Sequence, residues 1–261
     1  MTKQIWIALL LAATPAFVSA QGRGGAQPPK SPKEAAPVDL TGYWVSIVTE
    51  DWRWRMVTPL KGDSASVPVT TAARKVIDAW DPAKDEAAGL QCKAYGAPAV
   101  MRIPGRVHIT WQDDNTLKIE TDAGTQTRLF HFAIGTGQAK PPERAEPSWQ
   151  GYSVANWERP IRPPEASGLG VQRVGNNGRS LEVVTTQLRP GYLRKNGVPY
   201  SANASVAEYY DRHKEPNGDE YFTVTTIVTD PEYLAVPFVT STDFRREGDG
   251  SKFSPTPCSA R

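Results

Sequence analysis

The sequence predicts an all-β protein, an antiparallel β-barrel with one short helix and long proline-rich loops. Apolar and polar residues alternate through three strand-length segments within residues 106–132, which are separated by the turn sequences Asp-Asp-Asn and Asp-Ala-Gly. Residues 206–212 can pair with residues 221–229 across the turn Glu-Pro-Asn-Gly-Asp. Closure into a barrel removes the exposed strand edges that a chain so rich in strands would otherwise have.

The first 20 residues have the composition of a cleavable export signal. They contain the early Lys3, an apolar run over residues 5–13 and the small-residue ending Val18-Ser19-Ala20. We therefore expect a periplasmic or secreted protein without a membrane span, because the apolar run is shorter than the roughly 20 residues that a spanning helix needs. Residues 21–38 lack an apolar period and predict a flexible lead-in, followed by a single barrel domain over residues 39–261.

The charge and the cysteines limit the partners and the compartment. A formal net charge of +2 provides no strong field to attract a polyanion, so nucleic acid is not an expected partner. The chain has two cysteines, Cys92 and Cys258, and in an oxidising compartment such a pair is more often joined than free. We therefore predict a disulfide between them. The sequence does not indicate the oligomeric state.

Residues 42–56 alternate as in a half-buried strand. One face carries Arg53 and Arg55, and the other carries the large side chains of Trp44, Val48, Trp52, Trp54 and Met56. Because aromatic rings dominate buried area, the second face can be core or can line a ligand cavity.

A helix is predicted over residues 72–80, with Thr70 or Thr71 as its N-cap and Pro82 ending it. The following residues 81–104 are rich in Ala, Gly and Pro. They are predicted to be irregular and to lie over the sheet or along a barrel rim.

The segment 106–132 also predicts which residues face one another. A three-residue first turn pairs His108 with Glu120 on a polar face. The opposite, buried face then carries Val107, Ile109, Trp111, Leu117, Ile119 and Thr121. The length of the second turn decides which residues of the third strand lie on the buried face. A three-residue turn puts Arg128 diagonal to Glu120 and buries His131, whereas a two-residue turn reverses both placements.

Residues 139–164 contain six prolines and are predicted to form a loop rather than a central strand. This loop carries Trp149, Tyr152 and Trp157, whose rings can stack on sugars or aromatic ligands or can pin the loop to the body. Further strands are predicted over residues 180–188 and 238–245, in addition to the hairpin of residues 206–229.

Several segments together resemble a large group of exported proteins of environmental bacteria that has no assigned activity. The segments are Trp149-Gln-Gly-Tyr-Ser-Val-Ala-Asn-Trp-Glu158, Leu181-Glu-Val-Val-Thr-Thr186, Glu208-Tyr-Tyr-Asp-Arg212 and Val228-Thr-Asp-Pro-Glu-Tyr-Leu234. The resemblance implies export and β architecture, and it transfers no catalytic residue.

The motif Gly42-Tyr43-Trp44 resembles the Gly-X-Trp motif of lipocalin-like barrels. This resemblance implies a tryptophan that closes one end of the barrel beneath a late arginine, for which Arg245 and Arg246 are the candidates.

Specific catalytic signatures are absent from the sequence, including a Gly-X-Ser-X-Gly elbow, a P-loop, a dinucleotide-binding glycine motif and His-Glu-X-X-His. The candidate catalytic residues are His108 and Glu120 as an acid/base pair, which Arg128 can extend. The same residues can instead form a charge ladder on a solvated sheet face. If His131 shares that face, a metal site becomes conceivable, but we expect neither a metal nor a cofactor.

The leading hypothesis is an exported protein that binds a small, partly apolar or aromatic ligand in an aromatic-lined barrel cavity. The candidate ligand-binding residues are Trp44, Trp52, Trp54, Trp111, His131, Trp149, Tyr152, Trp157 and Tyr210. The alternative is a cofactor-independent lyase, isomerase or hydrolase of the same fold that uses His108 and Glu120.

Overall fold

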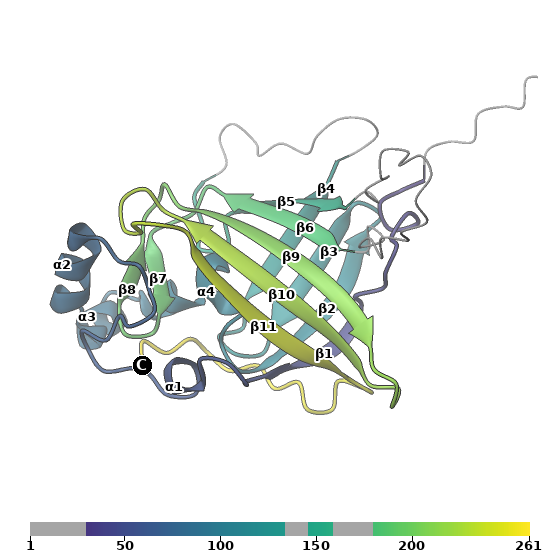
Figure 1. The fold of residues 1–261 in the computed structure, drawn as a ribbon, viewed down its shortest axis with the longest axis horizontal. Helices are drawn as coiled ribbons and strands as arrows, with labels where there is room; N and C mark the ends of the chain where they lie inside the picture. Colours follow the sequence, from purple (N-terminus) through teal and green to yellow (C-terminus); the bar gives the residue numbers. More distant parts are fainter. Residues whose placement is uncertain (1–29, 134–145, 159–179) are drawn as a thin grey trace, which may run out of the picture.

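Nine strands form a closed barrel in the computed structural model, which describes residues 30–133, 146–158 and 180–261 (Figure 1). The strands are β1 Gly42–Ile47, β2 Arg106–Asp113, β3 Thr116–Thr121, β4 Thr127–Phe132, β5 Tyr152–Trp157, β6 Leu181–Thr186, β9 Ser205–Lys214, β10 Glu220–Thr229 and β11 Phe238–Glu247. They follow one another around the barrel in the order β1-β11-β10-β9-β6-β5-β4-β3-β2. The all-β barrel expected from the sequence is therefore confirmed.

One pair of barrel strands, β4 and β5, is parallel, with Phe130 opposite Ser153 and Phe132 opposite Ala155. The other eight pairings between described barrel strands are antiparallel. A ring with an odd number of strands cannot alternate in direction all the way round, so nine strands require at least one parallel pair. The expectation of a purely antiparallel barrel is wrong at this pair.

Short helices and a small hairpin gather at one end of the barrel, on the left of Figure 1, which we call the capped end. The elements are α1 Trp52–Arg55, α2 Thr71–Ala79, α3 Pro82–Ala87, the 3-10 helix η1 Gln91–Tyr95, α4 Ala97–Val100, β7 Gly191–Arg194 and β8 Val198–Tyr200. Ile77 of α2, Leu193 of β7 and Val198 of β8 pack into one apolar cluster with Val206 and Phe238 from the barrel strands. This cluster fixes the cap to the barrel.

The cap contains two corrections to the sequence predictions. The strand predicted over residues 42–56 ends at Ile47, and Trp52 and Trp54 lie in the single turn α1, which follows Asp51 in a left-handed conformation with φ 56°. Four residues of alternating Trp and Arg fit one helical turn as well as a strand, so period two over so short a run does not discriminate. Residues 81–104 are not irregular, because they contain α3, η1 and α4.

The helix predicted over residues 72–80 is confirmed as α2, the longest helix in the described ranges. The side chain of Thr70 accepts a hydrogen bond from the backbone N–H of Ala73 at 3.2 Å, as an N-cap residue does. None of the helices that the structure describes is long and apolar enough to cross a bilayer.

The register of β2 and β3 confirms the pairing of His108 with Glu120, with an irregularity between Trp111 and Asp113. Strand β4 pairs Ile119 with Arg128, and the backbone N–H of Thr121 donates to the carbonyl of Gln126, so residues 122–125 form the turn. A four-residue turn has the same parity as a two-residue turn. It therefore turns Arg128 into the barrel and His131 outward.

The segment predicted as a proline-rich loop contains the barrel strand β5, so that prediction is wrong for Tyr152 and Trp157. Pro147 precedes the strand, and a proline excludes a strand only where its missing N–H is needed. The predicted strands at β6, β9, β10 and β11 are confirmed.

Both ends of the described chain are attached to the barrel. Cys92 and Cys258 form the predicted disulfide, which links η1 to the C-terminal segment. Residues 30–38, part of the predicted flexible lead-in, lie at the barrel end opposite the cap, where the indole N–H of Trp157 donates to the carbonyl of Pro32 at 2.9 Å. We call residues 30–38 the strap, and this end of the barrel the strap end. The predicted export signal lies outside the described residues.

Large side chains fill the barrel interior. Trp44, Phe130, Tyr210, Phe222 and Phe244 are buried and pack in one cluster. Polar side chains are buried toward the capped end, namely Arg128, Ser153, Thr185, Glu208, Thr226 and Thr242. The interior is thus an aromatic core beside a polar network.

Candidate functional site

His108 and Glu120 lie on the outer wall of the barrel, because their strand neighbours Val107 and Ile119 are buried in the core. The His108 ring stacks on Tyr43 of β1 with a centroid separation of 4.0 Å. Its Nδ1 lies 3.5 Å from the Glu120 carboxylate. Lys118 forms an ion pair with the same carboxylate, with its Nζ at 3.0 Å. A convex outer wall does not enclose a substrate, so this arrangement favours the charge ladder over the acid/base site.

Arg128 does not extend this pair, since it points into the barrel. Its Nη1 and Nη2 donate to the two carboxylate oxygens of Glu208 at 2.9 and 2.6 Å, and Nη2 also reaches the hydroxyl of Thr185 at 3.3 Å. Tyr210 donates to Glu208 at 3.2 Å. Burial opposes the charge on Arg128, but the interactions with Glu208 and Tyr210 together outweigh it and raise the pKa of Arg128. The network is closed to solvent and holds its own counter-charge.

The predicted aromatic residues do not meet in one cavity. Trp44 is fully buried in the core, and the guanidinium carbon of Arg246 lies 5.5 Å from its ring centroid, the geometry expected from the Gly-X-Trp resemblance. Tyr210 belongs to the same core. His131 stacks on Tyr152 on the outer wall, with a centroid separation of 4.6 Å.

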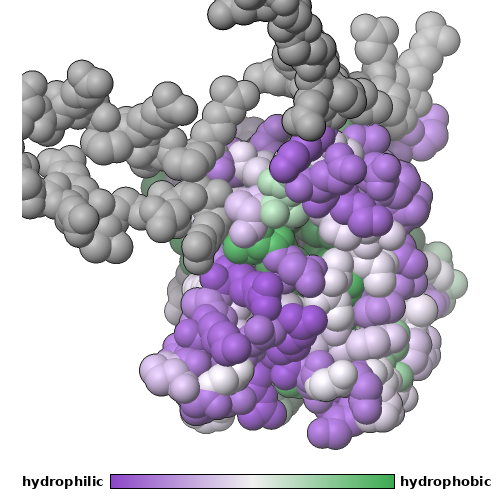
Figure 2. All heavy atoms as spheres, turned by 90° about the vertical axis from the view of Figure 1, so that its right-hand side faces the viewer, coloured by the Kyte–Doolittle hydropathy of each residue, from purple (hydrophilic) through white to green (hydrophobic). Residues whose placement is uncertain are grey.

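Trp111 and Trp157 lie at the strap end, on either side of Phe132, with ring centroids 5.5 and 5.4 Å from it. Trp111 also borders an open surface groove of about 530 Å³ between β2 and the strap. Figure 2 views this end of the molecule and shows a small apolar area within a largely hydrophilic surface.

Trp149 fixes its loop to the body, because its indole N–H donates to the carbonyl of Pro190 at 3.2 Å and Arg189 lies over its ring at 4.6 Å. Trp52 is exposed on α1. Trp54, two residues later, is a wall of a small pocket at the capped end. A single aromatic-lined cavity is therefore not formed by the residues that the sequence suggested.

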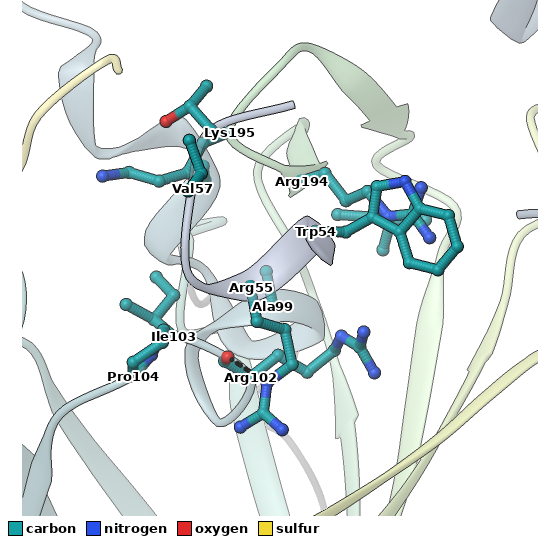
Figure 3. Close-up of a pocket in the computed structure, with 12 residues that line it drawn as sticks. Trp54, Arg55, Val57, Ala99, Arg102, Ile103, Pro104, Arg194 and Lys195 are labelled. Atoms are coloured by element: carbon teal, nitrogen blue, oxygen red, sulfur yellow. Dashed lines mark hydrogen bonds between the residues drawn. The ribbon is translucent and has the colours of Figure 1, made fainter. Parts of the chain in front are cut away.

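The pocket at Trp54 is lined by three buried arginines, and we call it the arginine pocket. Arg55, Arg102 and Arg194 expose only 8%, 6% and 5% of their surface, and the pocket that they border has a volume of about 40 Å³. Arg55 comes from α1, Arg102 follows α4, and Arg194 ends β7. Figure 3 shows Trp54 beside Arg194, and Arg55 close to Arg102.

Each guanidinium is only partly satisfied by protein groups. Arg55 Nε donates to the carbonyl of Arg102 at 2.9 Å, and Arg102 Nη2 donates to the carboxylate of Asp51 at 2.7 Å. Arg194 Nη1 donates to the carbonyl of Ala65 at 2.7 Å, and its guanidinium lies 4.8 Å from the centroid of the Trp54 ring. Within the described part of the chain, no carboxylate lies within ion-pair distance of Arg194.

Four guanidinium nitrogens in the arginine pocket are buried and have no hydrogen-bond acceptor among the described residues. They are Nη2 of Arg55, Nη1 of Arg102, and Nε and Nη2 of Arg194. Burial and the neighbouring charge of Arg102 lower the pKa of Arg55, and the same two causes lower the pKa of Arg194 to about 10. Arg194 therefore remains charged at neutral pH, and all three guanidinium groups have donors that lack acceptors. Chemically, the pocket is suited to an anion.

Sequence reasoning missed this pocket because its arginines come from three distant segments and share no motif. The alternation of residues 42–56 placed Arg55 on the polar face of a strand. The available signal was Arg102, which is embedded in the apolar run Ala-Pro-Ala-Val-Met-Arg-Ile.

Groups that would suit a metal are not assembled in the described ranges, where no three His, Cys, Asp or Glu side chains converge. The candidate site is the arginine pocket, which residues of α1 and β7 and the segment after α4 form at the capped end. Comparison of the chain with protein-family models, with curated proteins and with solved structures finds no match.

Proposed function

We propose that this is an exported binding protein for a small anionic molecule, which is held in the arginine pocket. One observation carries the proposal, namely the four buried guanidinium nitrogens without acceptors. A buried hydrogen-bond donor that is left unpaired costs about 1–3 kcal/mol, and a charged donor costs more. An anion with two oxygens can accept from several of these nitrogens at once.

The barrel interior provides an internal comparison for this argument. Arg128 is as buried as the pocket arginines, and Glu208 accepts two hydrogen bonds from it. In the arginine pocket, Asp51 and Glu50 pair with Arg102 and Arg55, which leaves Arg194 as the unbalanced charge. A bound anion would take the place that Glu208 takes at Arg128.

The size of the pocket favours a small anionic group. A cavity of about 40 Å³ holds a carboxylate or another small oxyanion rather than a whole metabolite. Val57, Thr58 and Lys195 also line the pocket and are not buried, so the remainder of a larger ligand can extend past them to solvent. Trp54 supplies an aromatic wall, in keeping with the aromatic ligand expected from the sequence.

Export completes the proposal. The disulfide between Cys92 and Cys258 fits an oxidising compartment such as the periplasm or the cell exterior. The signal-like composition of the first 20 residues points to the same compartments.

Thermal unfolding of the purified chain in the presence of small anions tests this function. Acetate, benzoate and inorganic phosphate are added in a buffer without other strong anions, since a ligand that binds only the native state raises the apparent stability. At a concentration of about 100 times Kd, the stabilisation is about 2.7 kcal/mol. We expect at least one of these anions to raise the melting temperature.

Two variants locate the binding. Arg194→Met removes the unbalanced guanidinium, and its melting temperature should no longer respond to the anion. Arg53→Met is the control, because Arg53 lies on the same turn with a side chain that is 68% exposed. An equal response of both variants, or no response of the native chain to any anion, contradicts the proposed function.

A further inference from the structure

An exposed apolar strip adjoins the arginine pocket. Trp52, Met56, Val57 and Leu60 expose 65%, 60%, 70% and 83% of their surface. Trp52 and Met56 are four residues apart at α1, and side chains at this spacing share one helix face. Four large apolar side chains within nine residues form a patch of the kind that marks a binding surface, whereas apolar residues scattered singly do not.

Val57 connects the two features, because it lines the arginine pocket and belongs to the apolar strip. In Figure 3 it lies on the segment that leaves α1, near Lys195. The carbonyl of Leu60 accepts from the side chain of Asn196 at 2.9 Å, so the strip is tied to the β7–β8 hairpin that carries Arg194. Positive charge and exposed apolar side chains thus adjoin at Val57.

From this arrangement we infer that the ligand is amphipathic, a carboxylate joined to an apolar chain or ring that covers Val57, Leu60, Met56 and Trp52. The inference rests on the proposed function, since the arginine pocket holds the carboxylate. Charge complementarity identifies the head group, and the strip identifies the tail. An anion without an apolar part would leave the strip in water.

A series of carboxylates of increasing chain length measures the tail contact. Acetate, hexanoate, octanoate and decanoate are titrated below their micelle concentrations by calorimetry. Burial of one methylene contributes up to about 0.8 kcal/mol, which corresponds to about fourfold in affinity for full burial. Against an open strip we expect roughly twofold per methylene beyond the pocket. Arg194→Met should abolish binding of the whole series.

The double variant Val57→Ser, Leu60→Ser separates the tail from the head group. Both side chains are exposed, so the fold should tolerate the change. We expect acetate binding to persist while the gain from hexanoate to decanoate disappears, which lowers decanoate affinity about 16-fold at twofold for each of the four methylenes. Val236→Ser is the matched control, because Val236 is 59% exposed in the turn before β11. It should leave all affinities unchanged.

The outcomes distinguish the two proposals. Equal affinity for acetate and decanoate, with both lost in Arg194→Met, keeps the proposed function and overturns the amphipathic ligand. Absence of binding for the whole series overturns the amphipathic carboxylate, and it overturns the proposed function as well if benzoate and inorganic phosphate also fail to bind. Two further results overturn the inference: a dimer in sedimentation that the serine variants dissociate, with no effect on decanoate, and binding to phosphatidylglycerol vesicles without binding of monomeric decanoate. The first would assign the strip to a second copy of the chain, and the second to a membrane surface.

Discussion

Arg128 and Glu208 form an ion pair with two hydrogen bonds inside the barrel, and solvent reaches neither side chain. The two residues come from β4 and β9, on opposite sides of β5 and β6 in the barrel order. Their contact therefore spans the interior rather than a single strand pair. Because both charges are desolvated, each side chain needs the other to compensate its buried charge.

Glu208→Gln should lower the free energy of unfolding by about 3–5 kcal/mol, since removing one partner of a buried pair leaves an uncompensated charge. Chemical denaturation measures this change. Glu120→Gln on the outer wall, where Glu120 is 35% exposed beside His108, should change stability by less than about 1 kcal/mol. The double variant Arg128→Met, Glu208→Leu should recover part of the loss. Equal effects of the two glutamine substitutions would contradict this interpretation.

The disulfide gives a second prediction. Cys92 and Cys258 are 166 residues apart in sequence, and a cross-link that closes a long loop restricts the unfolded chain. The double variant Cys92→Ser, Cys258→Ser should lose about 2–5 kcal/mol of stability, measured by chemical denaturation. Addition of a reductant should lower the stability of the native chain toward that of the variant and leave the variant unaffected. A variant as stable as the native chain would contradict the prediction.

The register of β2 and β3 could be predicted from the sequence because the alternation from Val107 to Trp111 leaves only one face fit for burial. The turn before β4 could not, because four residues form it, and Gly124 and Thr125 have φ values of 79° and 49°. The polar residues Gln126 and Thr127 suit either register. The ion pair of Arg128 followed from this turn and was missed for that reason.

The arginine pocket could not be predicted because the packing of the cap, rather than any local pattern, brings its residues together. Arg55, Arg102 and Arg194 are separated by 47 residues or more along the chain. By contrast, the Gly-X-Trp resemblance implied a late arginine above Trp44 and left Arg245 and Arg246 as candidates, of which Arg246 lies over the ring. Local pairing was accessible to sequence reasoning, and convergence of loops was not.

The contact between Trp44 and Arg246 gives a third prediction. Trp44 is fully buried, and its indole N–H donates to the carbonyl of Leu40 at 2.9 Å. Trp44→Ala should cost about 3–5 kcal/mol of stability. Arg246→Ala should cost about 1 kcal/mol, because a cation over an aromatic ring contributes about 0.5–2 kcal/mol. A double-mutant cycle that gives no coupling between them would show that their proximity has no energetic role.

His131 gives a prediction for pH dependence. Burial lowers its pKa below the usual 6.5, and the charge of Asp113 only partly opposes this. The unfolded chain therefore binds the proton more tightly than the folded chain, so the contribution of His131 to stability is present above pH 6.5 and is lost as pH falls through the folded pKa. Denaturation at pH 7.5, 6.0 and 5.0 should show a smaller decline in His131→Gln than in the native chain. His213→Gln, at a half-exposed histidine that also stacks on a tyrosine, is the control and should retain the native decline. The interpretation fails if His131→Gln declines as steeply as the native chain over this range.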